Sequence, residues 1–199
     1  MSACSMRTAN GSPVHEAVRI DGFPCRSQYP LTPVDYPIRT ACPDDHDAVQ
    51  ALLEASYPAL FRGWYDGDVL AAALPLMTKA NRKLLASGRF FIAANGDGII
   101  VGCGGWSLDR PGSGEIETGL GHVRHFATHP GRLRQGIGGA LLQRSVDDAG
   151  SQGVMRLECN SSLAAVDFYR TAGFHDTGPV RVDLGGGVTL PGLLMHRNL

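Results

Sequence analysis

The sequence has little net charge and no long apolar run. Its 199 residues include 18 basic and 19 acidic side chains, which leave a formal net charge of −1. A chain so close to neutral has no global field that attracts nucleic acid or an anionic membrane. No stretch approaches the roughly 20 apolar residues of a membrane helix, and residues 1–16 lack the apolar run of a signal peptide. We therefore expect no nucleic-acid partner, no membrane partner and a cytoplasmic location.

The cysteines also lack the spacing of a metal or disulfide site. There are five of them, widely separated and without a Cys-x-x-Cys pair. An odd number with such spacing favours neither a disulfide framework nor a metal centre. We expect reduced, mostly buried thiols and no bound metal.

The chain length suits one α/β domain with a tail. Residues 1–33 contain four prolines and no sustained period, which predicts an irregular N-terminal extension, and residues 34–199 form the domain. Hydrophobic patterning predicts strands at 34–40, 90–94, 99–107, 122–128, 154–159, 180–184 and 193–196. It predicts helices that begin near Pro43 and that span 68–85 (with a break at Pro75), 136–149 and 163–171. Residues 112–121 are expected to form a flexible connection.

The sequence between the first two predicted helices is crowded with aromatic side chains. It runs from Tyr57 to Tyr65 and includes Phe61 and Trp64. This connection could line a substrate pocket, or Phe61 and Trp64 could be ordinary core residues. The sequence leaves both interpretations open.

The residues with the clearest chemistry are 132–142, Arg-Leu-Arg-Gln-Gly-Ile-Gly-Gly-Ala-Leu-Leu, which follow an apolar strand and enter a helix. Glycines let main-chain amides approach an anion, and a helix N-terminus adds about half a positive charge. No Asp or Glu occurs from Thr118 to Val146, although the segment holds four arginines. A Walker loop is excluded because no Lys-Ser/Thr follows the glycines, and a Rossmann fingerprint is disfavoured because Leu141 stands at its third glycine. The segment therefore predicts a phosphate or pyrophosphate site.

Residues 122–174 resemble the core of the GNAT acetyltransferase superfamily. Gly136-Ile137-Gly138 matches the glycines of that family's pyrophosphate loop, while Phe168-Tyr169 and Gly173-Phe174 match its later signature. The flanking elements follow the family's order, so the resemblance extends from Tyr36 to the C-terminus. It implies an α/β (α+β) fold, with a mixed, mostly antiparallel sheet of six or seven strands flanked by helices.

The resemblance implies acetyl-CoA as cosubstrate, held between splayed fourth and fifth strands. The main chain of Phe126 and Thr128 would hold the pantetheine arm. The binding residues implied are Phe126, Ala127, Thr128, Arg134, Gln135, Gly136, Ile137, Gly138, Gly139 and Ser162. Two residues depart from the family pattern: Leu133 replaces the usual Gln or Arg, and Ser162 stands where many relatives carry Asn, a contact that Asn160 could also supply.

The resemblance also implies direct attack of an amine on the thioester in a ternary complex. Tyr169 would be the general acid, since a phenol of pKa about 10 can protonate a thiolate of pKa about 8.5. A core aromatic packed beside Phe168 is the alternative role for Tyr169. Cys159 is expected to be a small buried residue rather than an acyl carrier.

A base is required because an alkylammonium acceptor has a pKa of about 10.4. His122, six residues before Thr128, stands where several family members place a glutamate base, and an imidazole titrates in a useful range. His122 could equally be structural, and Glu115 and Glu117 are further candidates. Arg124, on the same strand face, could orient an acidic substrate or be solvated.

The implied function is acetyl transfer from acetyl-CoA to a small-molecule or peptide amine, in a protein that could be a homodimer like many relatives. A longer acyl donor, an oxygen acceptor and a non-catalytic acyl-CoA-binding sensor are the alternatives. Trp106, which ends a strand, could wall the acceptor site or pack in the core.

Overall fold

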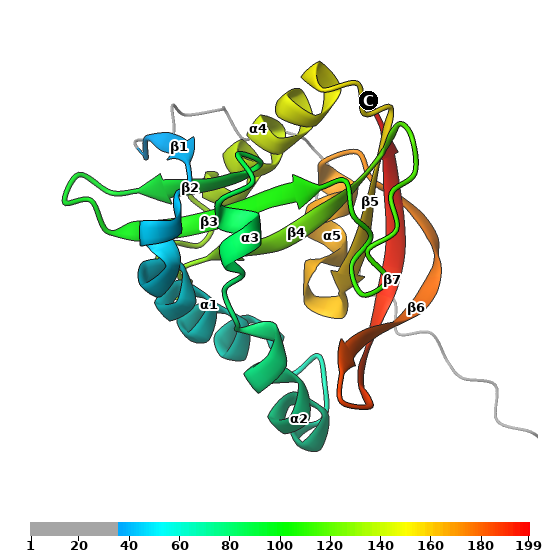
Figure 1. The fold of residues 1–199 in the computed structure, drawn as a ribbon. Coiled ribbons are helices and arrows are strands. Elements are labelled where there is room, and N and C mark those ends of the chain that lie inside the picture. The colour runs from blue at the N-terminus through cyan, green and yellow to red at the C-terminus, as the bar shows by residue number, and fades with distance from the viewer. Residues whose placement is uncertain (1–35) are drawn as a thin grey trace, which may run out of the picture. The chain divides into compact units, whose positions relative to one another are not determined.

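The computed structural model describes residues 36–199, so the predicted extension at residues 1–33 lies outside the described part of the chain. In this part, a sheet of seven strands runs in the order β1-β2-β3-β4-β5-β7-β6 (Figure 1). The strands are β1 (Ile38–Thr40), β2 (Phe90–Ala94), β3 (Ile100–Ser107), β4 (Leu120–Thr128), β5 (Arg156–Ser162), β6 (His175–Gly185) and β7 (Val188–Asn198). Only the β4–β5 pair is parallel. The predicted mixed, mostly antiparallel sheet is confirmed.

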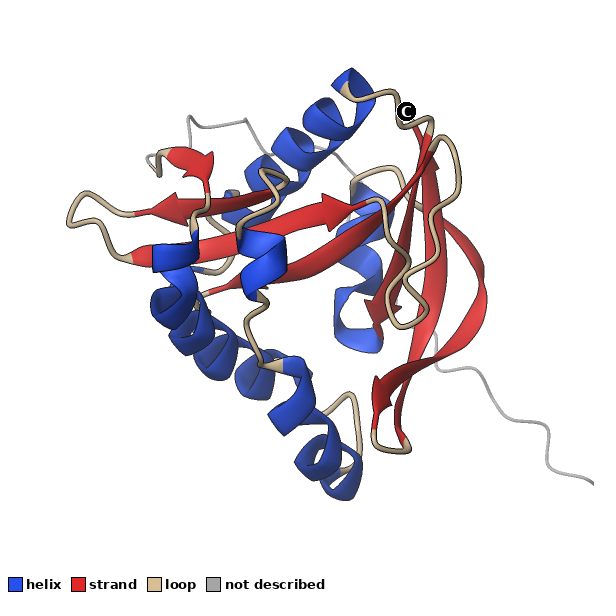
Figure 2. Ribbon diagram, viewed as in Figure 1, coloured by secondary structure: helices blue, strands red, loops and turns tan. Residues whose placement is uncertain are grey.

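Helices cover both faces of the sheet (Figure 2). They are α1 (His46–Phe61), α2 (Gly67–Met77), α3 (Arg82–Leu85), α4 (Ile137–Ser151) and α5 (Val166–Thr171). The first three pack with Phe90 and Ile92 in one apolar cluster, and the last two pack with Phe91 and Ala93 in another. Successive strand residues point to opposite faces. Because both faces of β2 are covered, its sequence reads as a continuous apolar run rather than an alternating one.

The predicted helix break at Pro75 is wrong. Helix α2 continues through Pro75 to Met77, and the chain leaves the helix only at Thr78, whose N–H still bonds the carbonyl of Leu74. A proline removes one hydrogen bond of the helix, to the carbonyl four residues earlier. That residue is Ala71, which is exposed, so water can replace the lost donor.

The last two strands are longer than predicted. They form a hairpin from His175 to Asn198 that turns at Gly186 and Gly187, both of which have positive φ. Residues 175–179, on the edge strand β6, carry no apolar alternation because all of them are exposed or only partly buried. Within residues 36–199, no helix is long and apolar enough to cross a membrane.

Candidate active site

The turn before α4 exposes main-chain N–H groups. Gly136, the residue that precedes the helix, has φ 78° and Arg134 has φ 61°, so the chain turns sharply into α4. The first helical bond of the turn runs from the N–H of Ala140 to the carbonyl of Gly136. The N–H groups of residues 137–139 therefore have no intrahelical acceptor, and no side chain caps them. Residues 131–136 are exposed, whereas Ile137 is buried and anchors the turn to the sheet.

Gly138 brings this turn against two other elements. A Cβ atom built on Gly138 would lie 3.3 Å from the Phe168 ring of α5 and 3.6 Å from the Thr128 hydroxyl at the end of β4. The side chain of Gln135 accepts a 2.6 Å hydrogen bond from the Tyr36 hydroxyl. The glycine turn, the end of β4 and α5 thus meet at one place.

Strands β4 and β5 separate beside this turn. Their pairing extends only from Leu120 opposite Arg156 to His122 opposite Glu158. Beyond that point β4 continues to Thr128 and β5 to Ser162, and β5 is paired only with β7. Figure 2 shows the two strands diverging. Along the opening, the main-chain groups of β4 and β5 that face each other have no partner strand.

The register of β3 and β4 decides which groups face the opening. The N–H of His129 donates to the carbonyl of Val101, and Ala127 pairs with Cys103 two residues further along the ladder. In an antiparallel ladder alternate residues bond the same neighbour, so Ala127 turns its main-chain groups towards β3. Phe126 and Thr128 turn theirs towards β5, although the Thr128 carbonyl already accepts a 3.0 Å bond from Ser56 of α1. Ala127 therefore contributes no group to the opening, because its main-chain groups face β3 and its side chain is buried.

Ser162 is the last residue of β5, and its carbonyl accepts a 2.9 Å hydrogen bond from the hydroxyl of Ser161. It is partly buried, whereas Asn160 is exposed. Both residues lie on the stretch of β5 that has separated from β4.

Tyr169 of α5 is buried among aromatic rings. Its ring centroid lies 5.0 Å from that of Phe168, 5.4 Å from that of Phe174 and 6.4 Å from that of Phe126. Burial raises the pKa of Tyr169 well above its usual value, and the neighbouring Cys159 thiol raises it further through a hydrogen bond. Tyr169 therefore stays protonated at neutral pH and can act only as a proton donor or a packing residue.

Cys159 on β5 is almost fully buried. Burial raises the pKa of its thiol to about 12, although the hydrogen bond with Tyr169 opposes this. Since the thiolate is the nucleophilic form, Cys159 is inert at neutral pH.

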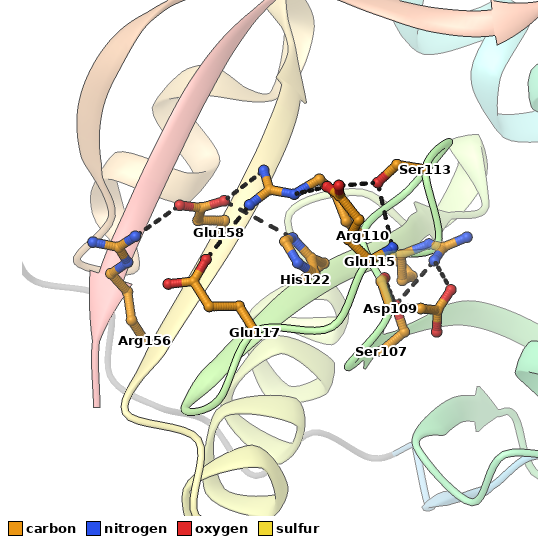
Figure 3. A network of polar contacts seen from close by, with 10 residues as sticks. Ser107, Asp109, Arg110, Ser113, Glu115, Glu117, His122, Arg156 and Glu158 are labelled. Atoms are coloured by element: carbon orange, nitrogen blue, oxygen red, sulfur yellow. Dashed lines mark hydrogen bonds and ion pairs between the residues drawn. The ribbon is translucent and has the colours of Figure 1, made fainter.

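His122 lies in a polar network at the paired ends of β4 and β5 (Figure 3). Its Nδ1 is 4.0 Å from Oε2 of Glu158, and the same carboxylate is 3.5 Å from Arg110 and 3.0 Å from Arg156. Burial and the charge of Arg110 lower the pKa of His122, while Glu158 opposes them. The imidazole is therefore neutral at neutral pH and can accept a proton.

A pocket of about 280 Å³ opens beside His122 and is lined by residues of the β3–β4 connection. Glu115 and Glu117 lie there, 3.9 and 3.8 Å from Arg110, and both are largely exposed. The sequence did not single out Glu158 or Arg110. Glu158 was recognisable in principle, because it precedes Cys159 on a strand predicted to run beside the one that carries His122.

Two residues considered for the acceptor site have structural roles. Trp106 is fully buried, and its Nε1 donates a 2.9 Å hydrogen bond to Asp148 of α4, so it is a packed indole. Arg124 is not freely solvated, because it donates a 2.9 Å bond to the Ser107 hydroxyl and lies 3.5 Å from Asp109.

The aromatic connection between α1 and α2 divides between core and surface. Phe61 is buried, whereas Trp64 is 53% exposed and is not a core residue. The hydroxyl of Tyr65 donates to the carbonyl of Pro191 at 3.0 Å and accepts from the N–H of Leu163 at 2.7 Å. Tyr65 thereby ties this connection to β7 and to the end of β5. Within residues 36–199 no group of His, Cys, Asp or Glu side chains is placed to hold a metal ion.

Comparison with known proteins gives consistent matches. The family model described as "Acetyltransferase (GNAT) domain" matches residues 70–188. An "IAA acetyltransferase" of Azospirillum brasilense is 32% identical over 92 residues, which are 45% of this chain and 56% of that protein. The match thus spans little more than half the length of that curated relative.

Solved structures resemble the fold. A GCN5-related N-acetyltransferase from Rhodopseudomonas palustris has a TM-score of 0.65 at 21% identity, over 82% of this chain and 96% of that one. The PaiA N-acetyltransferase of Thermoplasma acidophilum, solved in complex with coenzyme A, has a TM-score of 0.61 at 14% identity, over 82% and 99% of the two chains. At these identities the likeness concerns the fold alone.

Proposed function

The chain belongs to the GNAT acetyltransferase family, and on that premise we propose that it transfers an acetyl group from acetyl-CoA to an amine in a ternary complex. One observation carries the proposal: β4 and β5 separate beside a helix N-terminus whose N–H groups are exposed and uncapped. An anion and an extended arm can be bound there side by side.

The pyrophosphate of the cosubstrate is assigned to the turn before α4. The N–H groups of Ile137, Gly138 and Gly139 would donate to it, and Arg134 would add positive charge. Phe126 and Thr128 would bond the pantetheine arm through their main chains, and Ser162 is the candidate contact on β5. Ala127 is left out of these contacts, because its main-chain groups face β3.

The proton transfers are assigned to two groups that are both uncharged at neutral pH. An acceptor amine is mostly protonated there and must lose a proton before it can attack the acetyl carbonyl. Neutral His122 would accept that proton, directly or through a water molecule. Its place beside the last paired residues of β4 and β5 puts it at the apex of the opening.

Attack forms the new C–N bond and breaks the C–S bond, and the sulfur leaves as a thiolate that needs a proton. Tyr169 would supply it, because its phenol is protonated at neutral pH, although burial also makes it a weaker acid than a free phenol. The surplus proton on the new amide nitrogen then restores the phenol. An N–H group of β4 that faces the opening would stabilise the developing oxyanion.

A thiol-release assay with acetyl-CoA across a panel of small amines and peptides tests the proposal, with mass spectrometry of the acetylated product. We expect turnover with at least one amine, and a parallel arm with propionyl-CoA tests longer acyl donors. Binding of acetyl-CoA without turnover on any acceptor would instead indicate an acyl-CoA sensor. Absence of both binding and turnover would contradict the proposal.

A further inference from the structure

A second pocket, of about 600 Å³, opens between the α2–α3 connection and β4. Its polar lining includes three basic side chains, Lys79, Arg82 and Lys83, together with His125 of β4. No carboxylate lines it. Within residues 36–199, none of the three basic groups has a carboxylate oxygen within 4.0 Å.

The charge of this pocket contrasts with that of the pocket beside His122. There, Arg110 is surrounded by the carboxylates of Glu115, Glu117 and Glu158. Lys79 and Lys83 are the only two lysines in the sequence, and every other basic residue is an arginine or a histidine. Like charges gathered around one pocket attract an anion, although Asp47 of α1 lies close enough to Arg82 for the two charges to interact.

The basic residues stand on a segment held in place by hydrogen bonds. The N–H of Ala80 donates a 2.8 Å bond to the side chain of Gln50 on α1. The side chain of Asn81 accepts from the N–H groups of Lys83 and Leu84 at 2.9 and 3.2 Å and caps α3. The backbone under the three charges is therefore fixed before any ligand binds, which reduces the entropy cost of binding.

A β-bulge brings this pocket to the same face of the sheet as His122. His125 has φ 49°, and the β3–β4 register shifts there by one residue. Val123 and Phe126 pack with the cluster of α4 and α5, so His122 and Arg124 point to the opposite face. His125 points there too, because it lines the pocket with α2–α3 residues. Three residues of regular strand span roughly 10 Å, and the bulge makes the separation of His122 and His125 shorter than this.

His125 itself adds no positive charge. Burial, followed by the charge of Arg124, lowers its pKa to about 4. At neutral pH it is an uncharged hydrogen-bonding group on the β4 side of a pocket whose charge comes from the lysines and Arg82.

We propose, on the basis of the acetyl-transfer function above, that this pocket binds an anionic group of the acceptor. The acceptor is then an amine that also carries a carboxylate or a phosphate ester, with its amine beside His122 and its anion among Lys79, Arg82 and Lys83. The turn assigned to the cosubstrate phosphates contributes no residue to this pocket, and Ile137 at its end packs in the cluster of α4 and α5.

The kinetic test compares matched acceptors that differ in one group. The ω-aminoalkanoates from 4-aminobutyrate to 8-aminooctanoate are compared with their methyl esters, and phosphoethanolamine is added to separate phosphate from carboxylate recognition. We expect the anionic acceptors to have a KM about tenfold lower than the esters. The double variant Lys79→Ala/Lys83→Ala should abolish that difference without changing the KM for acetyl-CoA. Arg181→Ala, which removes an exposed charge from the edge strand β6, is the control and should preserve the difference.

A second test does not depend on turnover. Because the chain has two lysines, an acetylating N-hydroxysuccinimide ester labels only Lys79, Lys83 and the terminal amine, and mass spectrometry follows each rate. The protecting compounds are the N-acetyl derivatives, which cannot consume the reagent. We expect 8-acetamidooctanoate or N-acetylphosphoethanolamine to slow labelling of both lysines at least threefold, after correction by the rate at the terminal amine. The matched methyl ester or N-acetylethanolamine should have no such effect.

The proposed anion site would be overturned if charged and neutral compounds slowed the labelling of the two lysines equally, or if no compound slowed it. The acetyltransferase proposal would still stand if thiol release were observed. Protection without turnover on any acceptor would support the site and count against the proposed activity.

Discussion

His122 and Glu158 form the last residue pair of β4 and β5 before the two strands separate, with Nδ1 of the imidazole 4.0 Å from Oε2 of the carboxylate. The candidate base therefore sits at the apex of the opening that would receive the acetyl group. Arg110 approaches the same carboxylate to 3.5 Å. Burial lowers the pKa of His122, and of these two neighbours Arg110 lowers it further while Glu158 raises it.

That balance predicts opposite pH shifts for two variants. Activity should be lost as the pH falls through the pKa of His122, which burial and Arg110 hold below its usual value. Glu158→Gln removes a charge that stabilises the imidazolium, so the acid limb of kcat/KM should move to lower pH. Arg110→Gln removes a repelling charge, so the limb should move to higher pH. Two profiles shifted in the same direction, or neither shifted, would exclude His122 as the titrating base.

Tyr169→Phe should reduce kcat by about 10- to 10⁴-fold, because the leaving thiolate loses its proton donor. The KM for acetyl-CoA should change little, since the ring and its aromatic contacts remain. Tyr57→Phe is the control, because Tyr57 is equally buried and its pKa is also raised by burial. Wild-type turnover in Tyr169→Phe would leave the residue with a packing role only.

Cys159→Ala should retain turnover within about threefold, because direct attack needs no enzyme nucleophile. The stability loss should be about 1 kcal/mol for removal of a small buried side chain. Steady-state kinetics at saturating acetyl-CoA and a denaturant melt measure the two effects. A stable variant without turnover would point to an acyl-enzyme route instead.

Asp45 should stabilise the fold in a pH-dependent way. Hydrogen bonds from Arg39 and from the Cys42 N–H lower its pKa from 3.8 to about 2. This contribution is complete above pH 3.8 and is lost as the pH falls towards 2, so Asp45→Asn should cost about 1–2 kcal/mol at pH 7 and almost nothing near pH 2. The exposed neighbour Asp44→Asn is the control. Equal losses for Asp45→Asn at both pH values in chemical unfolding would exclude the charge as the cause.

The sequence predicted the central elements well because their signals are local. The predicted strands at 90–94 and 99–107 flank Asn95-Gly96-Asp97-Gly98, a local turn sequence, and the Asn95 side chain accepts from the N–H groups of Asp97 and Ile99. The glycine turn before α4 was also recognisable, because only particular residue types form it. Pro75 misled the prediction. A proline leaves the carbonyl four residues earlier without its helical donor, and the loss of helix stability depends on whether that carbonyl is exposed to water.

The rest of the site depends on contacts between distant segments. Arg110 lies far from Glu158 in sequence, and the bulge that turns His125 towards Lys79 and Lys83 follows from the β3–β4 register. The assignment of Ala127 to the cosubstrate also needed the β3–β4 register. The alternation of residues along β4 does not say which of them turn their main-chain groups towards β3.

Calorimetric titration of acetyl-CoA into Gly138→Trp tests the central assignment most directly. An indole at this position must displace Phe168 or fill the space beside Thr128, so it should block the turn and lower affinity by at least 100-fold. Gly150→Trp, the same substitution near the other end of α4 where a Cβ meets nothing within 4 Å, should bind like the wild type. Circular dichroism verifies that both variants are folded. Wild-type affinity in folded Gly138→Trp would contradict the binding of the cosubstrate at this turn.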